Sequence, residues 1–314
     1  MEWFILAFLA STLWAVVVIV DKFVLTHHIK DAFSYQIFLT ITLIPSVLVL
    51  FIFSSFHLQN YLYLSFYLTI FVIGTILGLV FVLYNKALLI EEVSRVTPLF
   101  YLSPLFVLLF ASLFLGESLS LKRYLGIGLL VFSAISVSLR RAEHKSNSKS
   151  LSLSISPALL LMLFLDLTMA GKDVLAKFFF SYMDYWSYLF WFILGNIAGR
   201  PLLLLLPGIR EKFIADMKSL SSGICLLCLL CLLCFISSSL ACIGYVLYFK
   251  AVSLTYVSLV SAIPSTMPFL VFLLAIMLSV FYPGSLKESI ERKGVIIKGF
   301  AVIMILIGSY LIVS

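Results

Sequence analysis

The stretch Tyr84-Asn85-Lys86-Ala87, which leads on to Pro104, returns in the second half of the chain as Tyr248-Phe249-Lys250-Ala251, which leads on to Pro268. In each copy an apolar run ends in Tyr-x-Lys-Ala, and a second apolar run follows that carries the proline. Val93-Ser94 aligns with Val257-Ser258 without a gap. A similarity spaced by about half the chain is too long for a solenoid repeat. It predicts that the chain consists of two homologous halves.

The composition places both halves in a membrane. Hydrophobic residues make up 63% of the chain and charged residues 11%, which is far from the composition of soluble domains. The net charge of +7 comes from Lys and Arg in short gaps between apolar runs. This pattern is typical of loops at an anionic membrane face, so we expect a lipid bilayer as partner and no nucleic acid. Met1-Glu2-Trp3 lacks the basic start of a signal peptide, so the first apolar run is predicted to stay as a spanning helix.

Ten apolar runs are long enough to cross a bilayer, for which a helix needs about 20 mostly apolar residues. They lie at residues 3–20, 33–56, 64–89, 96–115, 124–139, 157–180, 185–206, 223–249, 254–281 and 294–313. A basic, serine-rich linker at 140–156 separates the first five-helix repeat (1–139) from the second (157–314). Because five is odd, the second half enters the membrane in the opposite orientation. We therefore expect an all-α membrane protein of two inverted repeats around a central cavity, the usual build of a secondary transporter.

Four cysteines have the spacing of an iron–sulfur site, Cys225, Cys228, Cys231 and Cys234. Only leucines lie between them, within a helix-length apolar run, whereas a cluster needs a backbone looped around the iron. We interpret these cysteines as small hydrophobic residues. We expect no metal, no cofactor and no disulfide.

Several stretches resemble the drug/metabolite transporter superfamily and, within it, the EamA-type family. Leu13-Trp14-Ala15 with Lys22 is similar to the first-helix pattern of that family, and the Tyr-x-Lys-Ala stretch before Pro104 is similar to its third and fourth helices. The Gly116-Glu117 exit with Gly126 is similar as well. The second half departs from this pattern, with Met169 at the position expected for a tryptophan and no Gly-Glu exit at 281–284. A role for Glu117 is therefore not extended to that half.

The resemblance implies a secondary transporter that works by alternating access, of the amino-acid and metabolite exporter (efflux) type, with proton coupling as a hypothesis. Carriers of sugar phosphates, nucleotide sugars or lipid-linked sugars are alternatives for the cargo. A passive facilitator is an alternative for the mechanism. We expect a small-molecule substrate, a multi-pass protein of a prokaryotic plasma (inner) membrane, and a monomer with a homodimer as the alternative.

Asp166 is the sharpest single candidate, because a carboxylate in the middle of a span costs about 2.5–3.5 kcal/mol on insertion scales. One interpretation is a proton-coupling or cation-binding carboxylate. The others are an acid hydrogen-bonded to nearby Ser or Thr, or a helix that begins later. Asp173 follows two turns on along the same helix face, where Lys172 or Lys177 is positioned to neutralise it.

The remaining candidates have structural interpretations as well. Lys86 and Lys250 are predicted to end their helices, where snorkelling to the interface competes with gating or binding of anionic cargo. Trp14, Tyr84, Tyr101 and Tyr248 are predicted to line a cavity or to pack. Asn196 is expected to hydrogen-bond between helices, and the glycine pairs Gly74/Gly78 and Gly195/Gly199 to allow close helix packing. The candidate substrate-binding or coupling residues are Asp166, Trp14, Tyr84, Tyr248, Lys86, Lys250, Asn196, Ser94 and Ser258. The candidate hinges, which should bend the fourth and ninth helices, are Pro98, Pro104, Pro264 and Pro268.

The sequence disfavours an intramembrane enzyme. His27, His28, His57 and His144 all fall in predicted loops, and no His-Glu-x-x-His or Gly-x-Ser-x-Gly motif is present. Two arguments on orientation conflict: the odd-numbered loops hold most Lys and Arg, which places both termini outside, whereas the family resemblance implies termini inside. The charge bias is large, so we expect termini outside. Neither argument fixes the direction of transport.

Overall fold

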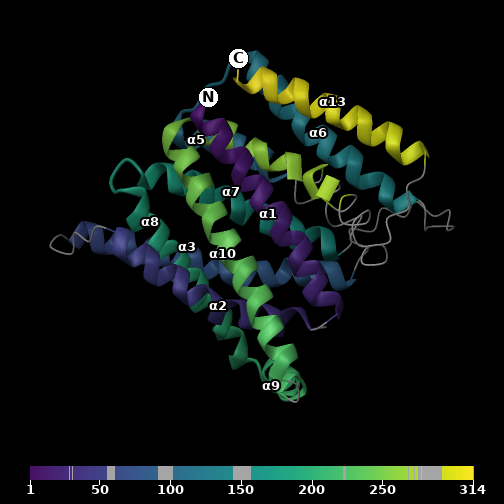
Figure 1. The fold of residues 1–314 in the computed structure, drawn as a ribbon. Helices are drawn as coiled ribbons and strands as arrows, with labels where there is room; N and C mark the ends of the chain where they lie inside the picture. The colour runs from purple at the N-terminus through teal and green to yellow at the C-terminus, as the bar shows by residue number, and fades with distance from the viewer. Residues whose placement is uncertain are drawn as a thin grey trace.

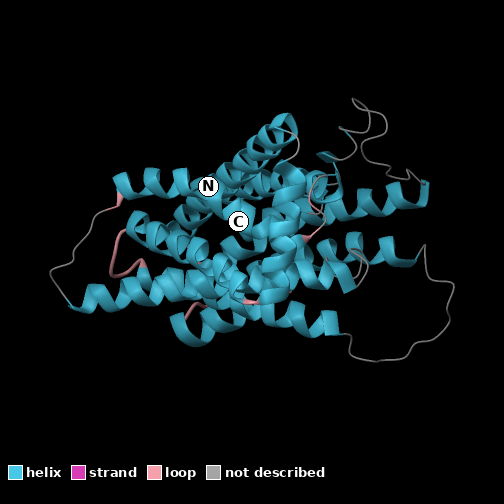
Figure 2. Cartoon of the chain, turned by 90° about the horizontal axis from the view of Figure 1, so that it is seen from below, coloured by secondary structure: helices cyan, strands magenta, loops and turns pink. Residues whose placement is uncertain are grey.

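The chain folds into a bundle of helices in the computed structural model (Figures 1 and 2). The structure describes residues 1–27, 29, 31–54, 61–90, 102–143, 157–221, 224–267, 269–271, 273–274, 277 and 292–313. In these ranges the helices are α1 (Glu2–His27), α2 (Ala32–Phe53), α3 (Tyr61–Ile90), α5 (Ser103–Leu115), α6 (Leu121–Glu143), α7 (Pro157–Phe179), α8 (Tyr185–Gly199), η1 (Arg200–Leu205), α9 (Pro207–Ser221), α10 (Ile224–Leu254), α11 (Val257–Ala262), η2 (Ile263–Thr266) and α13 (Arg292–Val313).

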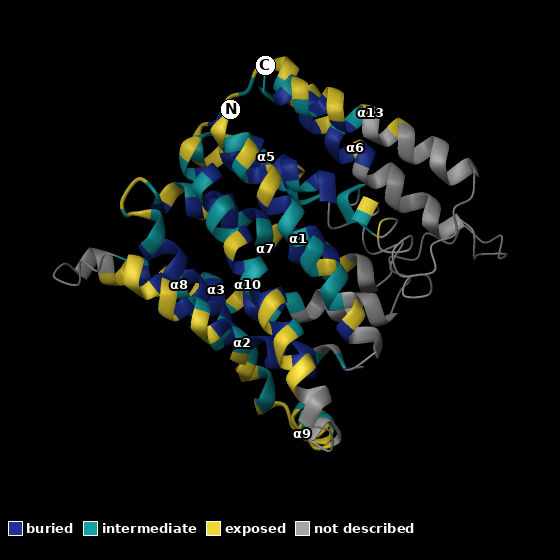
Figure 3. Cartoon of the chain, in the orientation of Figure 1, coloured by how far each residue is buried: buried dark blue, intermediate teal, exposed yellow. Residues whose placement is uncertain are grey.

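Several of these helices can cross a membrane. Within the described ranges, five are long and apolar enough by length and composition, at Glu2–Asp21, Phe33–Phe53, Leu64–Phe81, Tyr185–Leu205 and Cys228–Leu254, and shorter apolar helices accompany them. Large apolar side chains cover outward faces of the bundle, such as Leu48 and Ile52 on α2 and Phe114 on α5 (Figure 3). Such faces contact lipid tails in a membrane protein. The prediction of a helical, multi-pass membrane protein is confirmed for the described part of the chain, and ten spans in two repeats stays a prediction.

The closest helix pairs join segments that are far apart in the sequence. α3 packs along α8, α1 along α10, and α6 along α13 (Figure 1). Between α3 and α8 the backbones meet at glycines: a side chain on Gly74 would strike the Phe192 carbonyl, and one on Gly195 would strike the Phe71 carbonyl. The prediction that these glycines allow close helix packing is confirmed. The two predicted pairs pack against each other.

Four predicted boundaries are corrected by the structure. The first helix runs to His27, so His27 ends a helix and does not lie in a loop. The charged segment 210–218, predicted as a gap, belongs to α9 (Pro207–Ser221), where Pro207 stands at the start because the first turn needs no backbone donor. The seventh span changes from α8 to the 3-10 helix η1 at Arg200-Pro201, and the helix of Lys250 runs on to Leu254.

The hinge predictions have different outcomes. Pro104 lies in the first turn of α5, where a missing N–H costs no hydrogen bond, so it is not a mid-helix bend as predicted. Pro264 stands at the start of η2, directly after the short helix α11. The predicted ninth span is therefore 3-10 helical at Pro264, and a hinge at this position stays a prediction. Pro98 and Pro268 lie outside the described residues.

Candidate functional site

A buried ion pair lies where α7 faces α10. The ammonium of Lys172 is 2.6 Å from Asp173 Oδ1, and the Tyr248 hydroxyl donates to Asp173 Oδ2 at 2.9 Å. Lys172 and Asp173 expose only 4% and 5% of their surface. Of the two lysines predicted to neutralise Asp173, Lys172 forms the ion pair, whereas Lys177 donates to the Val252 carbonyl at 2.9 Å.

Aromatic rings surround this ion pair. The Lys172 ammonium lies 5.2 Å from the Tyr248 ring centroid and 5.8 Å from that of Tyr245, within the range of cation–π attraction. Trp14 of α1 completes the group, with ring centroids 5.3 Å from Tyr245 and 5.4 Å from Tyr248. We call Trp14, Lys172, Asp173, Tyr245 and Tyr248 the central cluster. It combines charge and aromatic surface at the contact of α1, α7 and α10.

Asp166 lies on the same helix as the ion pair, two turns earlier. Its side chain is 0% exposed, and neither carboxyl oxygen has a hydrogen-bond partner among the described residues. α7 begins at Pro157, so the interpretation in which the helix starts after Asp166 is wrong. The interpretation of a hydrogen bond to Ser or Thr finds no such partner in the described part of the chain. A bare carboxylate in an apolar interior is costly, so a proton or a cation would stabilise this position.

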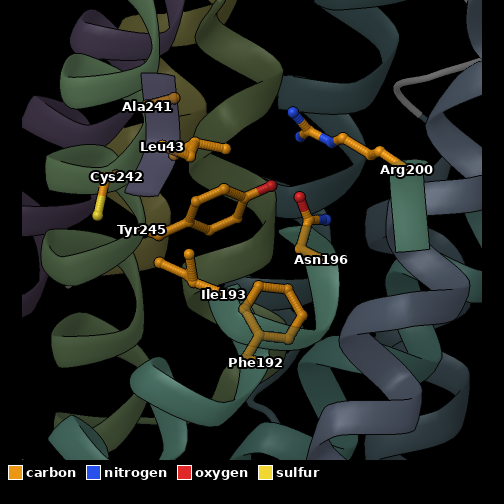
Figure 4. Close-up of a pocket in the computed structure, with 8 residues that line it drawn as sticks. All are labelled: Leu43, Phe192, Ile193, Asn196, Arg200, Ala241, Cys242 and Tyr245. Carbon is orange, nitrogen blue, oxygen red and sulfur yellow. The ribbon is translucent and has the colours of Figure 1, made fainter. Parts of the chain in front are cut away.

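A small cavity lies beside the central cluster, between α2, α8 and α10 (Figure 4). Its apolar wall includes Leu43, Phe192 and Ala241, and its volume is about 40 Å³. The Asn196 amide, the Arg200 guanidinium and the Tyr245 hydroxyl all point toward its centre (Figure 4). Arg200 Nε and Nη1 are buried and have no hydrogen-bond partner among the described residues. Tyr245 borders both this cavity, which we call the Arg200 pocket, and the central cluster.

A third polar group joins α1, α2 and α10. Asp21 Oδ1 accepts hydrogen bonds from the Tyr35 hydroxyl and from the Ser237 hydroxyl, both at 2.5 Å. Asp21 also lies within electrostatic range of Arg200. The Asp21 carboxylate, which acts electrostatically on Arg200, thus accepts hydrogen bonds from two hydroxyl groups.

Glu117 connects the two halves of the chain at the start of α11. Its carboxylate accepts from the backbone N–H groups of Val257, at 2.8 Å, and Ser258, at 3.3 Å, and from the Ser258 hydroxyl. A carboxylate is stabilising there, because the first N–H groups of a helix have no partner within the helix. Ser258, a candidate substrate-binding residue, therefore contacts Glu117, and its role in binding stays a prediction.

Comparison with known proteins fits this helical arrangement. The model of the EamA-like transporter family matches residues 1–139. We call this matched stretch, residues 1–139, the EamA-like segment. A solved structure described as "Crystal structure of protein" is similar over 100% of this chain and 98% of that chain, with a TM-score of 0.63 and 16% sequence identity. At that identity the likeness shows the fold alone. No curated protein matches the chain.

The EamA-like match confirms the predicted family resemblance over the first half of the chain. It indicates a multi-pass membrane transporter of the drug/metabolite type, and therefore a non-enzymatic protein. Trp14 and Glu117, whose motifs carried the resemblance, lie in the EamA-like segment and contact the second half, through Tyr248 and Ser258.

The structure brings together only some of the predicted residues. Trp14 and Tyr248 lie together in the central cluster, and Asn196 lines the Arg200 pocket. Lys250 lies apart from them, with its ammonium 4.9 Å from the Tyr185 ring centroid and four further residues of α10 beyond it, so it does not end its helix. The side chains of Tyr84 and Lys86, and the residues Ser94 and Tyr101, lie outside what the structure describes.

Sequence reasoning missed Tyr245, Arg200 and Asp21. Asp21 directly follows the predicted run 3–20, where a charge is normally interpreted as a loop signal, and Arg200 lies within the predicted run 185–206. Tyr245 stands three residues before Tyr248, so the two rings lie on one face of α10. That helical spacing was the available signal for Tyr245.

Proposed function

We propose that the chain is a secondary transporter that moves a small organic metabolite or drug across the membrane by alternating access. The observation that carries the proposal is the central cluster. It places a buried ion pair and three aromatic rings at the contact between α1 of the EamA-like segment and helices α7 and α10 of the second half. Polar groups are expensive at membrane depth, and they are retained where they serve a cavity or a pathway. Aromatic surface beside a few placed polar groups is also the usual lining of a small-molecule site.

The helix contacts support two repeats that are related by symmetry. If α1, α2 and α3 correspond to α7, α8 and α10, then the α1–α10 contact maps onto the α7–α3 contact. The α3–α8 contact maps onto the α10–α2 contact in the same way, and both members of each pair are present. The α6–α13 contact maps onto itself. A pseudo-two-fold axis between two inverted five-helix repeats requires this interchange of helix contacts. Rocking of one repeat against the other would expose the central cluster to each side of the membrane in turn.

Proton coupling through Asp166 is part of the proposal. Asp166 is buried without a described hydrogen-bond partner, and it shares α7 with the central cluster. Binding and release of a proton there would change the charge of the helix that carries Lys172 and Asp173. A transporter that alternates between a protonated and a deprotonated Asp166 would thereby couple cargo movement to the pH gradient.

The test is transport by the purified protein in liposomes. Radiolabelled amino acids and aromatic carboxylates are offered with and without an imposed pH gradient, and protein-free liposomes correct for passive entry. A coupled carrier accumulates its cargo above the outside concentration only when the gradient is present. A passive facilitator only equilibrates the cargo, and this result would replace the coupled mechanism by the facilitator alternative.

Orientation and location complete the proposal. The proposed orientation has both termini outside a prokaryotic plasma membrane, and the excess of Lys and Arg in the odd-numbered loops supports it. Alkaline phosphatase fused after Ser314 is active only outside that membrane, so activity is expected. An inactive fusion, paired with fluorescence of green fluorescent protein at the same position, would reverse the orientation.

A further inference from the structure

The Arg200 pocket combines a guanidinium, of which Nε and Nη1 are buried, with the room to receive an anion. Arg200 is the first residue of η1, directly after α8, and Asn196 lies one turn before it on the same side of the helix (Figure 4). A guanidinium stays charged in proteins, so burial does not remove the need for an acceptor. Its buried Nε and Nη1 find none among the described residues.

The groups around Arg200 have the chemistry of a carboxylate site. The guanidinium fork matches the two oxygens of a carboxylate, and the Asn196 amide and the Tyr245 hydroxyl can each donate a further hydrogen bond. A volume of about 40 Å³ admits a group of a few atoms and not an entire organic molecule. Tyr245 lines the pocket and also belongs to the central cluster, where its ring centroid lies 5.3 Å from that of Trp14.

We infer that the Arg200 pocket binds the carboxylate of the cargo, and that the cargo is an organic anion with an apolar or aromatic body that lies toward Trp14 and Tyr248. This inference rests on the proposed transport function and names its substrate class. Asp21 acts on Arg200 only as a charge at longer range, because Arg200 Nε and Nη1 have no hydrogen-bond partner among the described residues and the Asp21 Oδ1 atom accepts from Tyr35 and Ser237 instead. Lys172 does not compete for the cargo carboxylate either, because Asp173 neutralises it.

Acid and amide pairs test the inference on the full chain in detergent. The probes are 3-phenylpropionate against 3-phenylpropanamide, and benzoate against benzamide, each titrated in a thermal-shift assay. A ligand that binds only the folded protein raises the melting temperature by mass action. The acids should raise it and the amides should not. Equal responses to acid and amide, including no response to either, would overturn the inference.

Substitutions assign the acid preference to the pocket. Arg200→Gln should weaken acid binding at least tenfold, whereas Arg210→Gln, which removes the same side chain from an exposed position on α9, should leave it unchanged. Should Arg200→Gln fail to fold, Asn196→Asp serves in its place. It offers Arg200 an internal carboxylate, so it should raise the melting temperature of the ligand-free protein and abolish acid binding. Unchanged acid preference in Arg200→Gln or in Asn196→Asp would contradict the assignment.

Counterflow of labelled benzoate in liposomes separates this inference from the transport function. Acid-selective binding without counterflow would leave the pocket assigned and refute transport of this anion. Counterflow that proceeds equally in wild type and Arg200→Gln would leave transport standing and refute the role of Arg200.

Discussion

Of two buried acidic side chains on α7, one has close partners and the other has none among the described residues. Asp173 is held by Lys172 at 2.6 Å and by the Tyr248 hydroxyl at 2.9 Å, so its charge ties α7 to α10. Asp166, two turns earlier and equally buried, has no hydrogen-bond partner among the described residues. A buried carboxylate with partners on both helices stabilises one arrangement of those helices. A buried carboxylate without partners needs a proton, a cation or a ligand to stabilise it. Arg200 resembles Asp166 in this respect, with a positive charge: its buried Nε and Nη1 also have no hydrogen-bond partner among the described residues.

The largest effect should follow when the paired site is broken. Lys172→Met leaves Asp173 as an uncompensated buried charge, so it should destabilise the protein by about 3–5 kcal/mol. Unfolding in mixed detergent, followed by circular dichroism, measures the change. The double variant Lys172→Met/Asp173→Asn should recover most of the loss. Equal stability of the single variant and wild type would contradict a structural role for the pair.

A smaller effect is expected at the helix contact that supports the Arg200 pocket. Gly78→Ala places a methyl group against the backbone carbonyl of Asn196, so α3 and α8 must separate. Overpacking of this kind costs about 1–3 kcal/mol. The thermal midpoint should fall, and binding of 3-phenylpropionate should weaken. Gly171→Ala is the matched control, because a Cβ there meets nothing within 4 Å. A control that falls as far as Gly78→Ala would refute the close-contact explanation.

The carboxylate at the start of α11 should matter less. Glu117→Gln keeps the shape of the side chain and removes the charge that faces the first N–H groups of α11, which costs about 0.5–2 kcal/mol. Glu211→Gln on the exposed face of α9 is the control. Thermal unfolding of both variants at one detergent concentration tests this, and Glu117→Gln should be the less stable of the two. If both variants melt together, the cap carries no stability.

The smallest effect on stability should come from the unpaired site. Asp166→Asn removes a carboxylate that no described side chain stabilises, so the melting temperature should stay the same or rise. The contrast with Lys172→Met, measured in the same detergent, sharpens the comparison along α7. A large destabilisation by Asp166→Asn would show that Asp166 has a structural partner after all.

The sequence was sufficient for the type of fold and for part of the site. Long apolar runs separated by charges predicted an all-helical membrane protein, and paired glycines predicted close helix packing. The same rule of runs and gaps failed at α9, because an amphipathic helix with charges throughout does not look like a span. It also hid Asp21, because a charge at the end of an apolar run looks the same whether it faces water or a buried partner.

Contacts across the fold account for the rest. Both Lys172 and Lys177 were positioned to neutralise Asp173, and only the packing of α7 on α10 decides between them. The meeting of Trp14 with Tyr245 and Tyr248 joins α1 and α10 across more than two hundred residues, and local pattern carries no information on it. The partner of Ser258 was hidden for the same reason, since Glu117 lies in the other half of the chain.

Gradient-driven uptake tests the central claim most directly. Wild type and Asp166→Asn are reconstituted into liposomes, and uptake of labelled amino acids and aromatic carboxylates is followed with and without a pH gradient. The account predicts accumulation by wild type that requires the gradient, and exchange without accumulation by Asp166→Asn. Accumulation that is equally gradient-dependent in both proteins would contradict coupling through Asp166. No protein-dependent uptake of any tracer would contradict the transport of small organic metabolites itself.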